Sequence, residues 1–426
     1  MLSFKSINAE GGVSKIAAYY EGYQLGKENP NEKETTRQHD EPMGKWVGSY
    51  AEKRGFANQI VHRGEMQRGL RGFDPKTGEP LSNNAGDERH KPGYDLTFSA
   101  PKSVSIAWAS APDELRDKIG AAHQKALESA IKYAEQSGSF VQREGHAGEF
   151  KVAHGEIAAA TFEHSSNRAG EPHLHTHAVV LNVSENGKRV DFNAAHTHAI
   201  GTAYRAEFAR ELENLGFSIE KDGKSFRIEG FPKDLEKQLS TRAEQIAERE
   251  EKTGMKSDKV RDIHQIETRD KKTEKPREEA FNLAKETAAK HGFKTEDLLN
   301  RQPAEKEIQP LTATAFDQAS TLTKTQLHRA AFERAQTSGQ DISGALQELK
   351  ELEKSGDLVK LYDQEGNERW TSREMLEIEK DLHSYAFKES RGSSQAHASD
   401  VESIIEKKGL SKQQANCLKK IGRAHV

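Results

Sequence analysis

The chain has 426 residues but a single cysteine, Cys417, so no intrachain disulfide can form and a reducing compartment such as the cytosol is expected. It has no apolar run as long as a membrane span, and its first residues, MLSFKSINAEGG, lack the apolar core of a signal peptide. Charged residues make up 31% of the chain, and the mean hydropathy is −0.89. These properties predict a polar cytoplasmic protein of two or three domains with no membrane insertion.

Neither sign of charge dominates the sequence. Its 64 Lys and Arg residues against 68 Asp and Glu residues give a net charge of −4, so a DNA-binding surface would have to be local. The phosphate-binding pattern G-x-x-x-x-G-K-[ST] is also missing, because Ser218 stands where the Gly-Lys-Ser at 223–225 would need its first glycine. No ATPase core is therefore expected in this chain.

The segment EPHLHTHAVVLNV, residues 171–183, places His173, His175 and His177 on every second position of an apolar strand. Alternate residues of a strand share a face, so the imidazoles should point the same way. Neighbours lie roughly 7 Å apart at Cα, close enough to bind one ion, whereas the outer pair is about 13 Å apart. The strand therefore offers two metal ligands, and a third must come from elsewhere.

A third ligand is available on the preceding strand. GEIAAATFEH, residues 155–164, is a predicted strand ending at His164, and the polar stretch SSNRAGEP turns it into the histidine strand as a hairpin. Geometry alone leaves both His164 and His173 open as the third ligand. Three neutral imidazoles around a divalent ion would leave open positions that can polarise a phosphodiester oxygen. Surface or core histidines without a metal are the alternative.

Two further segments carry candidate chemistry. In GYDLTFSA, residues 93–100, Asp95 lies on the polar face of a predicted strand, where it could orient a metal-bound histidine or accept a proton. An exposed sheet face is the alternative. AAYYEGY supplies Tyr19, Tyr20 and Tyr23 at helical spacing, either for a core or as a phenol nucleophile. A phosphotyrosine ester conserves the free energy of a cleaved phosphodiester, which suits cleavage followed by rejoining.

GYDLTFSAPKSVS followed by TFEHSSNRAGEPHLHTHAVV, downstream of an N-terminal YY, closely resembles the MobF-type conjugative relaxases, the TraI and TrwC group of HUH endonucleases. The resemblance implies an α+β fold, with a palm-like antiparallel sheet that carries the site on one face and is covered by helices on the other. It also implies nicking of one plasmid strand at an origin of transfer. A 5′-phosphotyrosine and a 3′-OH would form, and the strand would later be rejoined.

The resemblance also implies roles for individual residues. Tyr19 would be the nucleophile with Tyr20 beside it, and Asp95 would be a catalytic carboxylate. One divalent ion (Mg, Mn or Zn) would be bound by His164, His175 and His177, with His173 as a neighbour. Arg168 would lie close to the scissile phosphate. Contacts to the DNA would come from Lys102, Arg269, Lys271 and Lys272. Many relatives carry a second tyrosine pair further downstream, but here only Tyr23 follows nearby, at a shorter spacing.

The relaxase region, residues 1–300, is followed by a predicted polar linker at 301–312. Residues 313–388 are predicted to form two helices and a hairpin, which suits a small winged-helix-like module. Residues 389–426 are predicted to be a Ser/Ala-rich linker and the truncated start of a helicase region. Two segments, TSREMLEIEKDL at 371–382 and LSKQQANCLKKI at 410–421, resemble the entry to a RecD-like helicase. The last residues, IGRAHV, can be encoded by a sequence that resembles a common sequencing adapter, so we expect the natural protein to continue into an ATPase.

The partners implied by the resemblance are single-stranded DNA at the origin of transfer, relaxosome accessory proteins and a type IV secretion coupling protein, with carriage of the protein into the recipient cell. A rolling-circle replication initiator with the same chemistry is one alternative, which the helicase-entry sequence and the N-terminal tyrosines disfavour. An inactive DNA-binding remnant is another, which the intact Tyr19, Asp95 and histidines disfavour.

Overall fold

A computed structural model describes residues 1–8, 12–21, 41–144, 149–241, 276–301, 308–391, 398–410 and 414–415. Tyr23, Cys417 and the predicted DNA contacts Arg269, Lys271 and Lys272 lie outside the described residues.

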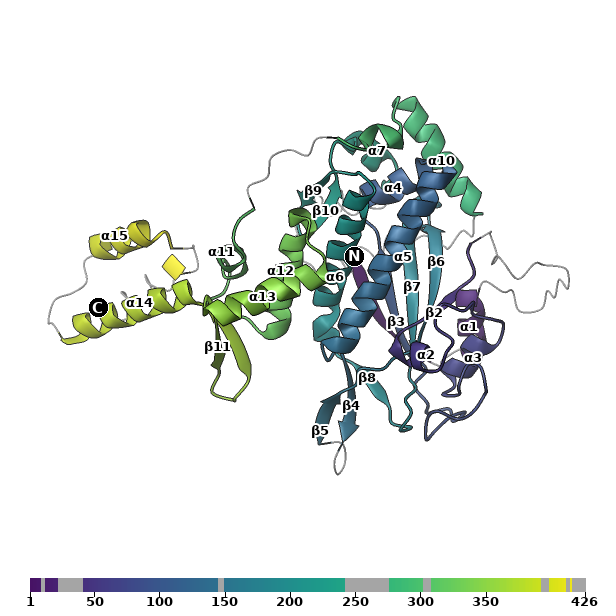
Figure 1. Ribbon diagram of the computed structural model, residues 1–426, viewed down its shortest axis with the longest axis horizontal. Coiled ribbons are helices and arrows are strands. Elements are labelled where there is room, and N and C mark those ends of the chain that lie inside the picture. Colours follow the sequence, from purple (N-terminus) through teal and green to yellow (C-terminus); the bar gives the residue numbers. More distant parts are fainter. Residues whose placement is uncertain are drawn as a thin grey trace.

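A five-stranded antiparallel sheet forms the centre of the molecule, in the order β1-β3-β7-β6-β2 (Figure 1). Its strands are β1 (Leu2–Ile7), β2 (Lys45–Val47), β3 (Gly93–Ser99), β6 (Ala159–Ser166) and β7 (Pro172–Leu181). The predicted strands around Asp95, His164 and the histidine row are confirmed, and β6 and β7 pair as the predicted hairpin. Because β7 lies in the middle, the strands on both sides can add side chains to its histidine face.

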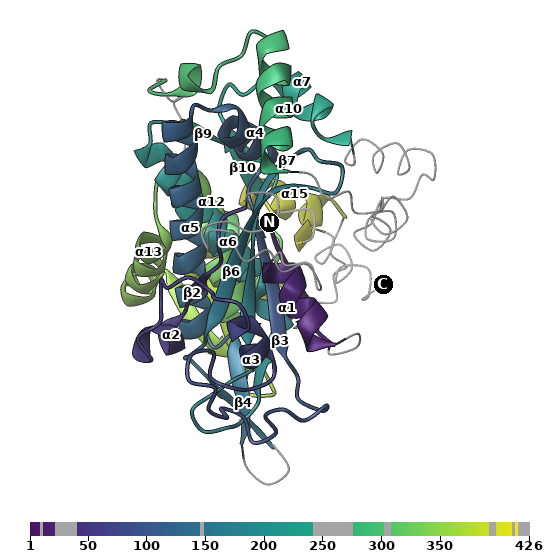
Figure 2. The same cartoon turned by 90° about the vertical axis from the view of Figure 1, so that its right-hand side faces the viewer.

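Helices cover both faces of this sheet. The face that carries Leu96 and Leu174 packs against α4 (Lys102–Ser110), α5 (Asp113–Gln136) and α6 (Thr197–Asn214). The opposite face is partly covered by α1 (Val13–Glu21), α2 (Ser49–Lys53) and α3 (Glu65–Leu70), and Figure 2 shows α1 lying over it. The sequence predicted helices on one face only. Helices α1, α2 and α3 also pack on the histidine face because Phe162 and Val179 make one end of it apolar.

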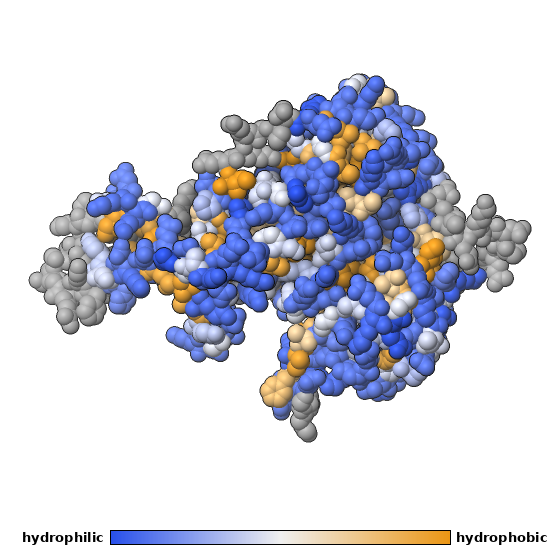
Figure 3. Space-filling view, in the orientation of Figure 1, coloured by the Kyte–Doolittle hydropathy of each residue, from blue (hydrophilic) through white to orange (hydrophobic). Residues whose placement is uncertain are grey.

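Smaller elements surround the core. β4 (Phe140–Glu144), β5 (Phe150–Ala153) and β8 (Val190–Phe192) form a second sheet, ordered β5-β4-β8, that was not predicted. Phe150 is 63% exposed on β5, and Figure 3 shows apolar atoms on this protruding hairpin. A further hairpin, around Gly223, consists of β9 (Ile219–Asp222) and β10 (Ser225–Ile228). The remaining elements of this region are η3 (Ala194–His196), α7 (Lys233–Gln238), α10 (Arg277–Lys290) and η4 (Thr295–Leu298).

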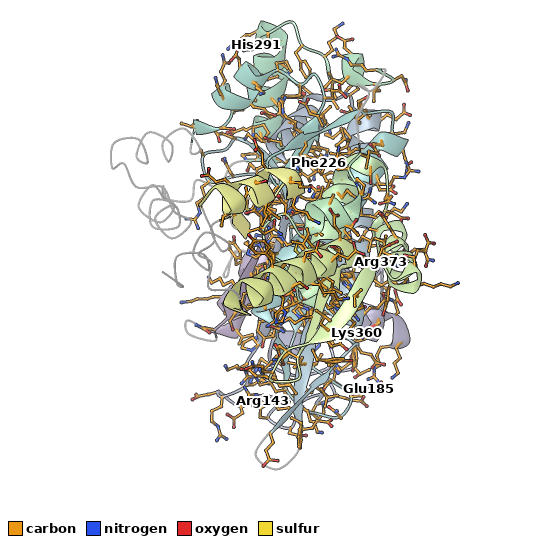
Figure 4. The ribbon with its side chains drawn as sticks, turned by 90° about the vertical axis from the view of Figure 1, so that its left-hand side faces the viewer. Arg143, Glu185, Phe226, His291, Lys360 and Arg373 are labelled. Carbon is orange, nitrogen blue, oxygen red and sulfur yellow. The ribbon has the colours of Figure 1, made fainter. Side chains whose placement is uncertain are left out.

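The segment after residue 308 packs on the helices that cover the sheet. It contains α11 (Leu311–Ala315), α12 (Lys324–Ser338), α13 (Ile342–Ser355), β11 (Leu358–Tyr362) and β12 (Glu368–Ser372), in the predicted order of helices and hairpin. His328 on α12 lies 2.9 Å from the Tyr133 hydroxyl on α5, and Phe332 belongs to the same apolar core as α5 and α6. Figure 4 shows this side of the molecule, with Lys360 and Arg373 labelled.

The two last helices differ from the predicted boundaries. α14 (Arg373–Arg391) continues past residue 388, and α15 (Ala398–Lys408) begins inside the predicted linker. The amphipathic periodicity of these segments outweighs their Ser- and Ala-rich composition, which does not by itself prevent a helix. No described helix combines the length and apolar character needed to cross a bilayer.

Candidate active site

Histidines from two strands meet on one face of the central sheet. His173, His175 and His177 alternate along β7 with residues that are buried on the opposite face. The pairing of β6 with β7 sets His164 directly opposite His175, and side chains opposite each other point to the same side. The ring centroids of His164, His175 and His177 form a triangle with sides of 5.3, 5.2 and 5.5 Å.

These distances suit three imidazoles around one ion. A metal–nitrogen bond of about 2 Å puts each ring centroid roughly 3.2 Å from the metal, so ligand rings are roughly 4.5–5.5 Å apart. His175 Nδ1 lies 2.9 Å from a backbone carbonyl oxygen and His177 Nδ1 lies 2.9 Å from Asp95. Since both partners only accept, Nδ1 is the donor in each ring and Nε2 carries the lone pair that a metal needs.

As they are placed, no three or more His, Cys, Asp or Glu side chains of the described residues are arranged so that they could hold a metal ion. The rings of the histidine cluster are close enough together, but they would have to rotate to direct their nitrogens at one point. The donor set fits a divalent transition metal, because imidazole nitrogen is a common ligand of such ions.

His173 lies at the edge of this cluster. Its ring centroid is 4.7 Å from that of His175, and its backbone carbonyl accepts the His175 Nδ1–H. Burial, with the charges of His175 and Lys102 adding to it, holds the pKa of His173 well below its ordinary value. The strand pairing thus favours His164 over His173 as the third member of the cluster, a choice that sequence spacing had left open.

Asp95 anchors the cluster from the neighbouring strand β3. Its carboxylate is 6% exposed and accepts hydrogen bonds from His177 Nδ1 at 2.9 Å, Tyr20 Oη at 2.9 Å and Thr97 Oγ1 at 3.2 Å. Burial opposes ionisation, but these donors outweigh it and hold the pKa of Asp95 below its ordinary value. The ionised carboxylate therefore orients His177 with Nε2 directed outward.

Thr97 is a contributor that sequence reasoning did not assign. Its hydroxyl lies 3.1 Å from His177 Nδ1 as well as 3.2 Å from Asp95 Oδ1. The available signal was its position two residues after Asp95, which puts both side chains on one face of β3.

The two adjacent tyrosines of α1 occupy different environments. Tyr20 is 6% exposed, stacks on Phe162 and donates its hydroxyl to Asp95. Burial, and after it the Asp95 charge, raises the pKa of Tyr20 far above that of an ordinary phenol, so this side chain stays protonated. Tyr19 is 46% exposed, with its ring centroid 6.4 Å from that of His177. Tyr19 is therefore the solvent-facing phenol beside the histidine cluster.

Arg168 lies in the turn between β6 and β7. The Asn167 side-chain oxygen accepts the backbone N–H groups of Ala169 and Glu171, which makes this turn compact. Within the part of the chain that the structure describes, the half-buried guanidinium of Arg168 forms no hydrogen bond or ion pair. The turn that joins Ser166 of β6 to Pro172 of β7 therefore carries a cation.

Lys102 begins α4 on the other side of this turn. Its ammonium donates to the Pro172 carbonyl oxygen at 2.9 Å and lies 4.0 Å from Glu171. Burial lowers the pKa of Lys102 to about 8, against the opposing effect of Glu171. The side chain ties α4 to the start of β7, and its DNA contact stays a prediction.

The fold and the site together define a class of protein. A solvent-facing tyrosine next to a carboxylate-anchored histidine cluster, on one face of an antiparallel sheet, offers a phenol nucleophile beside side chains of the metal-ligating type. The chain belongs to the TrwC relaxase family, whose sequence profile matches residues 13–291. By family it is therefore a relaxase.

The relatives include the multifunctional conjugation protein TraI of Escherichia coli K12 and a second Escherichia coli TraI, each 32% identical over 246 residues. These alignments cover 54% of this chain but only 13% of TraI, so the chain spans a small part of the length of these relatives.

Solved structures of the conjugative relaxase TrwC share the fold. A copper-bound complex with oriT DNA has a TM-score of 0.56 at 27% identity. A metal-bound oriT complex and a complex with a 27-mer comprising the recognition hairpin and the cleavage site each have 0.55 at 26%. Every one of these matches covers 69% of this chain and 100% of the solved chain. The comparisons confirm the predicted relaxase family, the α+β antiparallel fold and the predicted class of enzyme.

Proposed function

We propose that this chain cleaves one DNA strand at a plasmid origin of transfer and rejoins it, with Tyr19 as the nucleophile. The observation that supports this is the half-exposed Tyr19 phenol beside His177, which Asp95 orients. Tyr19 Oη attacks the scissile phosphorus, the P–O3′ bond breaks, and a 5′-phosphotyrosine forms. The phenolic proton passes to solvent and the departing 3′ oxygen takes up a proton. Rejoining is the reverse of this step.

His164, His175 and His177 would hold one divalent metal ion at the scissile phosphate. The ring distances support this assignment, as does the metal-bound structure of the related TrwC. When bound, the ion supplies Lewis-acid polarisation of a phosphate oxygen. Three nitrogen ligands favour Mn or Zn over Mg, which prefers oxygen ligands.

Charge on the phosphates would be met by basic side chains. Arg168 would stabilise the negative charge of the scissile phosphate, and Lys102, Arg269, Lys271 and Lys272 would contact the DNA backbone. Single-stranded origin DNA is the proposed substrate, supported by the TrwC complexes with oriT DNA. Relaxosome accessory proteins, a secretion coupling protein and passage into the recipient cell follow from the family alone.

The proposal is tested by trapping the covalent intermediate. Incubation with Mn²⁺ and single-stranded oligonucleotides carrying candidate origin sequences should give a protein–DNA band that survives denaturing electrophoresis. Tyr19→Phe should abolish the band and leave DNA affinity unchanged, because only a hydroxyl is lost from a half-exposed ring. Peptide mapping should place the adduct on Tyr19. A full-strength adduct from Tyr19→Phe, or an adduct mapped to Tyr20 or Tyr23, would show that the nucleophile is wrongly assigned.

A further inference from the structure

The β6–β7 ladder is irregular next to His164. Between the pairs His164–His175 and Ser166–Pro172 the register shifts, so that Ser165 of β6 faces two residues of β7, His173 and Leu174, in a β-bulge. Bulges near active sites commonly re-aim neighbouring side chains, and buried backbone groups beside them still need hydrogen-bond partners. Whatever satisfies Ser165 therefore also influences the direction of His164.

Glu41 is the hydrogen-bond partner of Ser165. Its Oε1 accepts the backbone N–H of Ser165 at 2.7 Å and the Ser165 hydroxyl at 2.6 Å. Glu41 is 8% exposed and Ser165 is fully buried, so water does not compete for these hydrogen bonds. β2 pairs with β6 with Lys45 opposite Thr161, and continuing that register brings Glu41 opposite Ser165. The pairing of β2 with β6 therefore places the Glu41 carboxylate next to Ser165.

Arg277, the first residue of α10, holds the other oxygen of this carboxylate. Its guanidinium lies 3.5 Å from Glu41 Oε2 and 3.3 Å from Glu163 Oε1, and 5.3 Å from the centre of the Trp108 ring. Glu163 directly precedes His164 in the chain. Arg277 therefore balances the charge of two carboxylates beside the bulge and fixes them against α10.

We propose that Glu41, held by Arg277, is a positioning residue that fixes Ser165 opposite the bulge of β7 and thereby places His164 for metal binding. The inference rests on the proposed function, in which His164 is a metal ligand. Glu41 acts through the backbone of Ser165. Without its carboxylate, β6 can shift at Ser165 and the neighbouring His164 can turn away from His175. The expected loss of metal affinity is about 10- to 100-fold, as for other groups that orient metal ligands.

The test is calorimetric titration of the whole chain with Mn²⁺ in the absence of DNA. Glu41→Ala should weaken binding by about 10- to 100-fold, and Glu41→Gln should recover much of it, since an amide oxygen still accepts from Ser165. Glu135→Ala is the matched control. Glu135 is also 8% exposed, and its Oε1 accepts the backbone N–H and hydroxyl of Ser49 at 2.9 and 2.6 Å.

Glu135 lies at the opposite end of β6, where it also accepts the Ile157 N–H. Its loss should lower the unfolding temperature to a similar extent as Glu41→Ala and leave Mn²⁺ affinity unchanged. Equal weakening of Mn²⁺ binding by Glu41→Ala and Glu135→Ala would mean that Glu41 has only a general structural role. If Glu41→Ala does not fold, Glu41→Gln against Glu135→Gln carries the same comparison.

Two further measurements separate this inference from the proposed function. In a His164→Ala background, Glu41→Ala should cause no additional loss of Mn²⁺ affinity, because the ligand it positions is gone. Additive losses would overturn the positioning role. If His164→Ala alone leaves the affinity unchanged, the ligand assignment fails, and NMR of the metal-free protein then decides about Glu41. The imidazole resonances of His164 should shift in Glu41→Ala more than those of His173, and an unmoved His164 would overturn the inference.

Discussion

Replacing Tyr20 by phenylalanine removes one hydroxyl and keeps the ring packed against Phe162 and His177. That hydroxyl donates at 2.9 Å to the buried carboxylate of Asp95. Hydrogen bonds to charged groups contribute about 1.5–3 kcal/mol to the free energy of unfolding. Because Asp95 keeps its two other donors, we expect a loss of about 1.5 kcal/mol at neutral pH, the low end of that range. Thr97→Val removes a longer hydrogen bond of 3.2 Å and should cost less.

The stability lost in Tyr20→Phe should depend on pH. Burial disfavours the Asp95 carboxylate, but its hydrogen bonds prevail and its pKa in the folded state is depressed. Asp95 therefore stabilises the fold above the unfolded-state pKa of about 3.9, and this contribution is lost as the pH falls through the folded-state pKa. Tyr20→Phe moves the folded-state pKa upward. The difference between wild type and variant should be full at pH 7 and should shrink below about pH 4.

Urea denaturation of wild type and variant, at pH 7 and at several acidic pH values, measures this difference. Adduct formation on origin oligonucleotides should be slowed in Tyr20→Phe but not abolished, because the solvent-facing Tyr19 is untouched. A stability difference that grows as the pH falls would refute the hydrogen-bond argument. A folded Tyr20→Phe that forms no adduct while Tyr19→Phe does would reverse the roles of the two tyrosines.

Three other outcomes are expected. Mn²⁺ binding and nicking should be weakened far more by His164→Ala, His175→Ala or His177→Ala than by His173→Ala. Mn²⁺ binding should also weaken as the pH falls, because protons compete with the metal for imidazole. If calorimetry finds that His173→Ala weakens binding equally, the assigned set of ligands is wrong. Arg168→Ala should slow single-turnover cleavage more than it weakens binding to the same oligonucleotide, whereas equal losses would make Arg168 a general phosphate contact. The chain should nick and rejoin DNA but show no DNA-stimulated ATP hydrolysis, because the G-x-x-x-x-G-K-[ST] pattern is missing. Phosphate release that rises when DNA is added would contradict this expectation.

Much of the site could be predicted from the sequence because strand alternation is a local property. The period of two placed His175 and His177 on one face of β7 and Asp95 on the polar face of β3, and the pairing of these strands confirms that they share a surface. The polar turn before residue 171 correctly indicated the β6–β7 hairpin. These features depend on neighbouring residues in the chain, so no long-range contact was needed to infer them.

The sequence by itself therefore determined the two central strands, the histidine face and the family. Only the tertiary structure distinguished Tyr19 from Tyr20, because both are the same phenol on one helix and only packing against Phe162 buries one of them. It also brought Glu41 to Ser165, opposite the bulge of β7 and 124 residues away in the chain. Such contacts depend on the order and register in which strands pair across the sheet. A local pattern of side chains does not contain that information. β2 is only three residues long, so its place in the sheet depends on the strand with which it pairs and not on its own sequence.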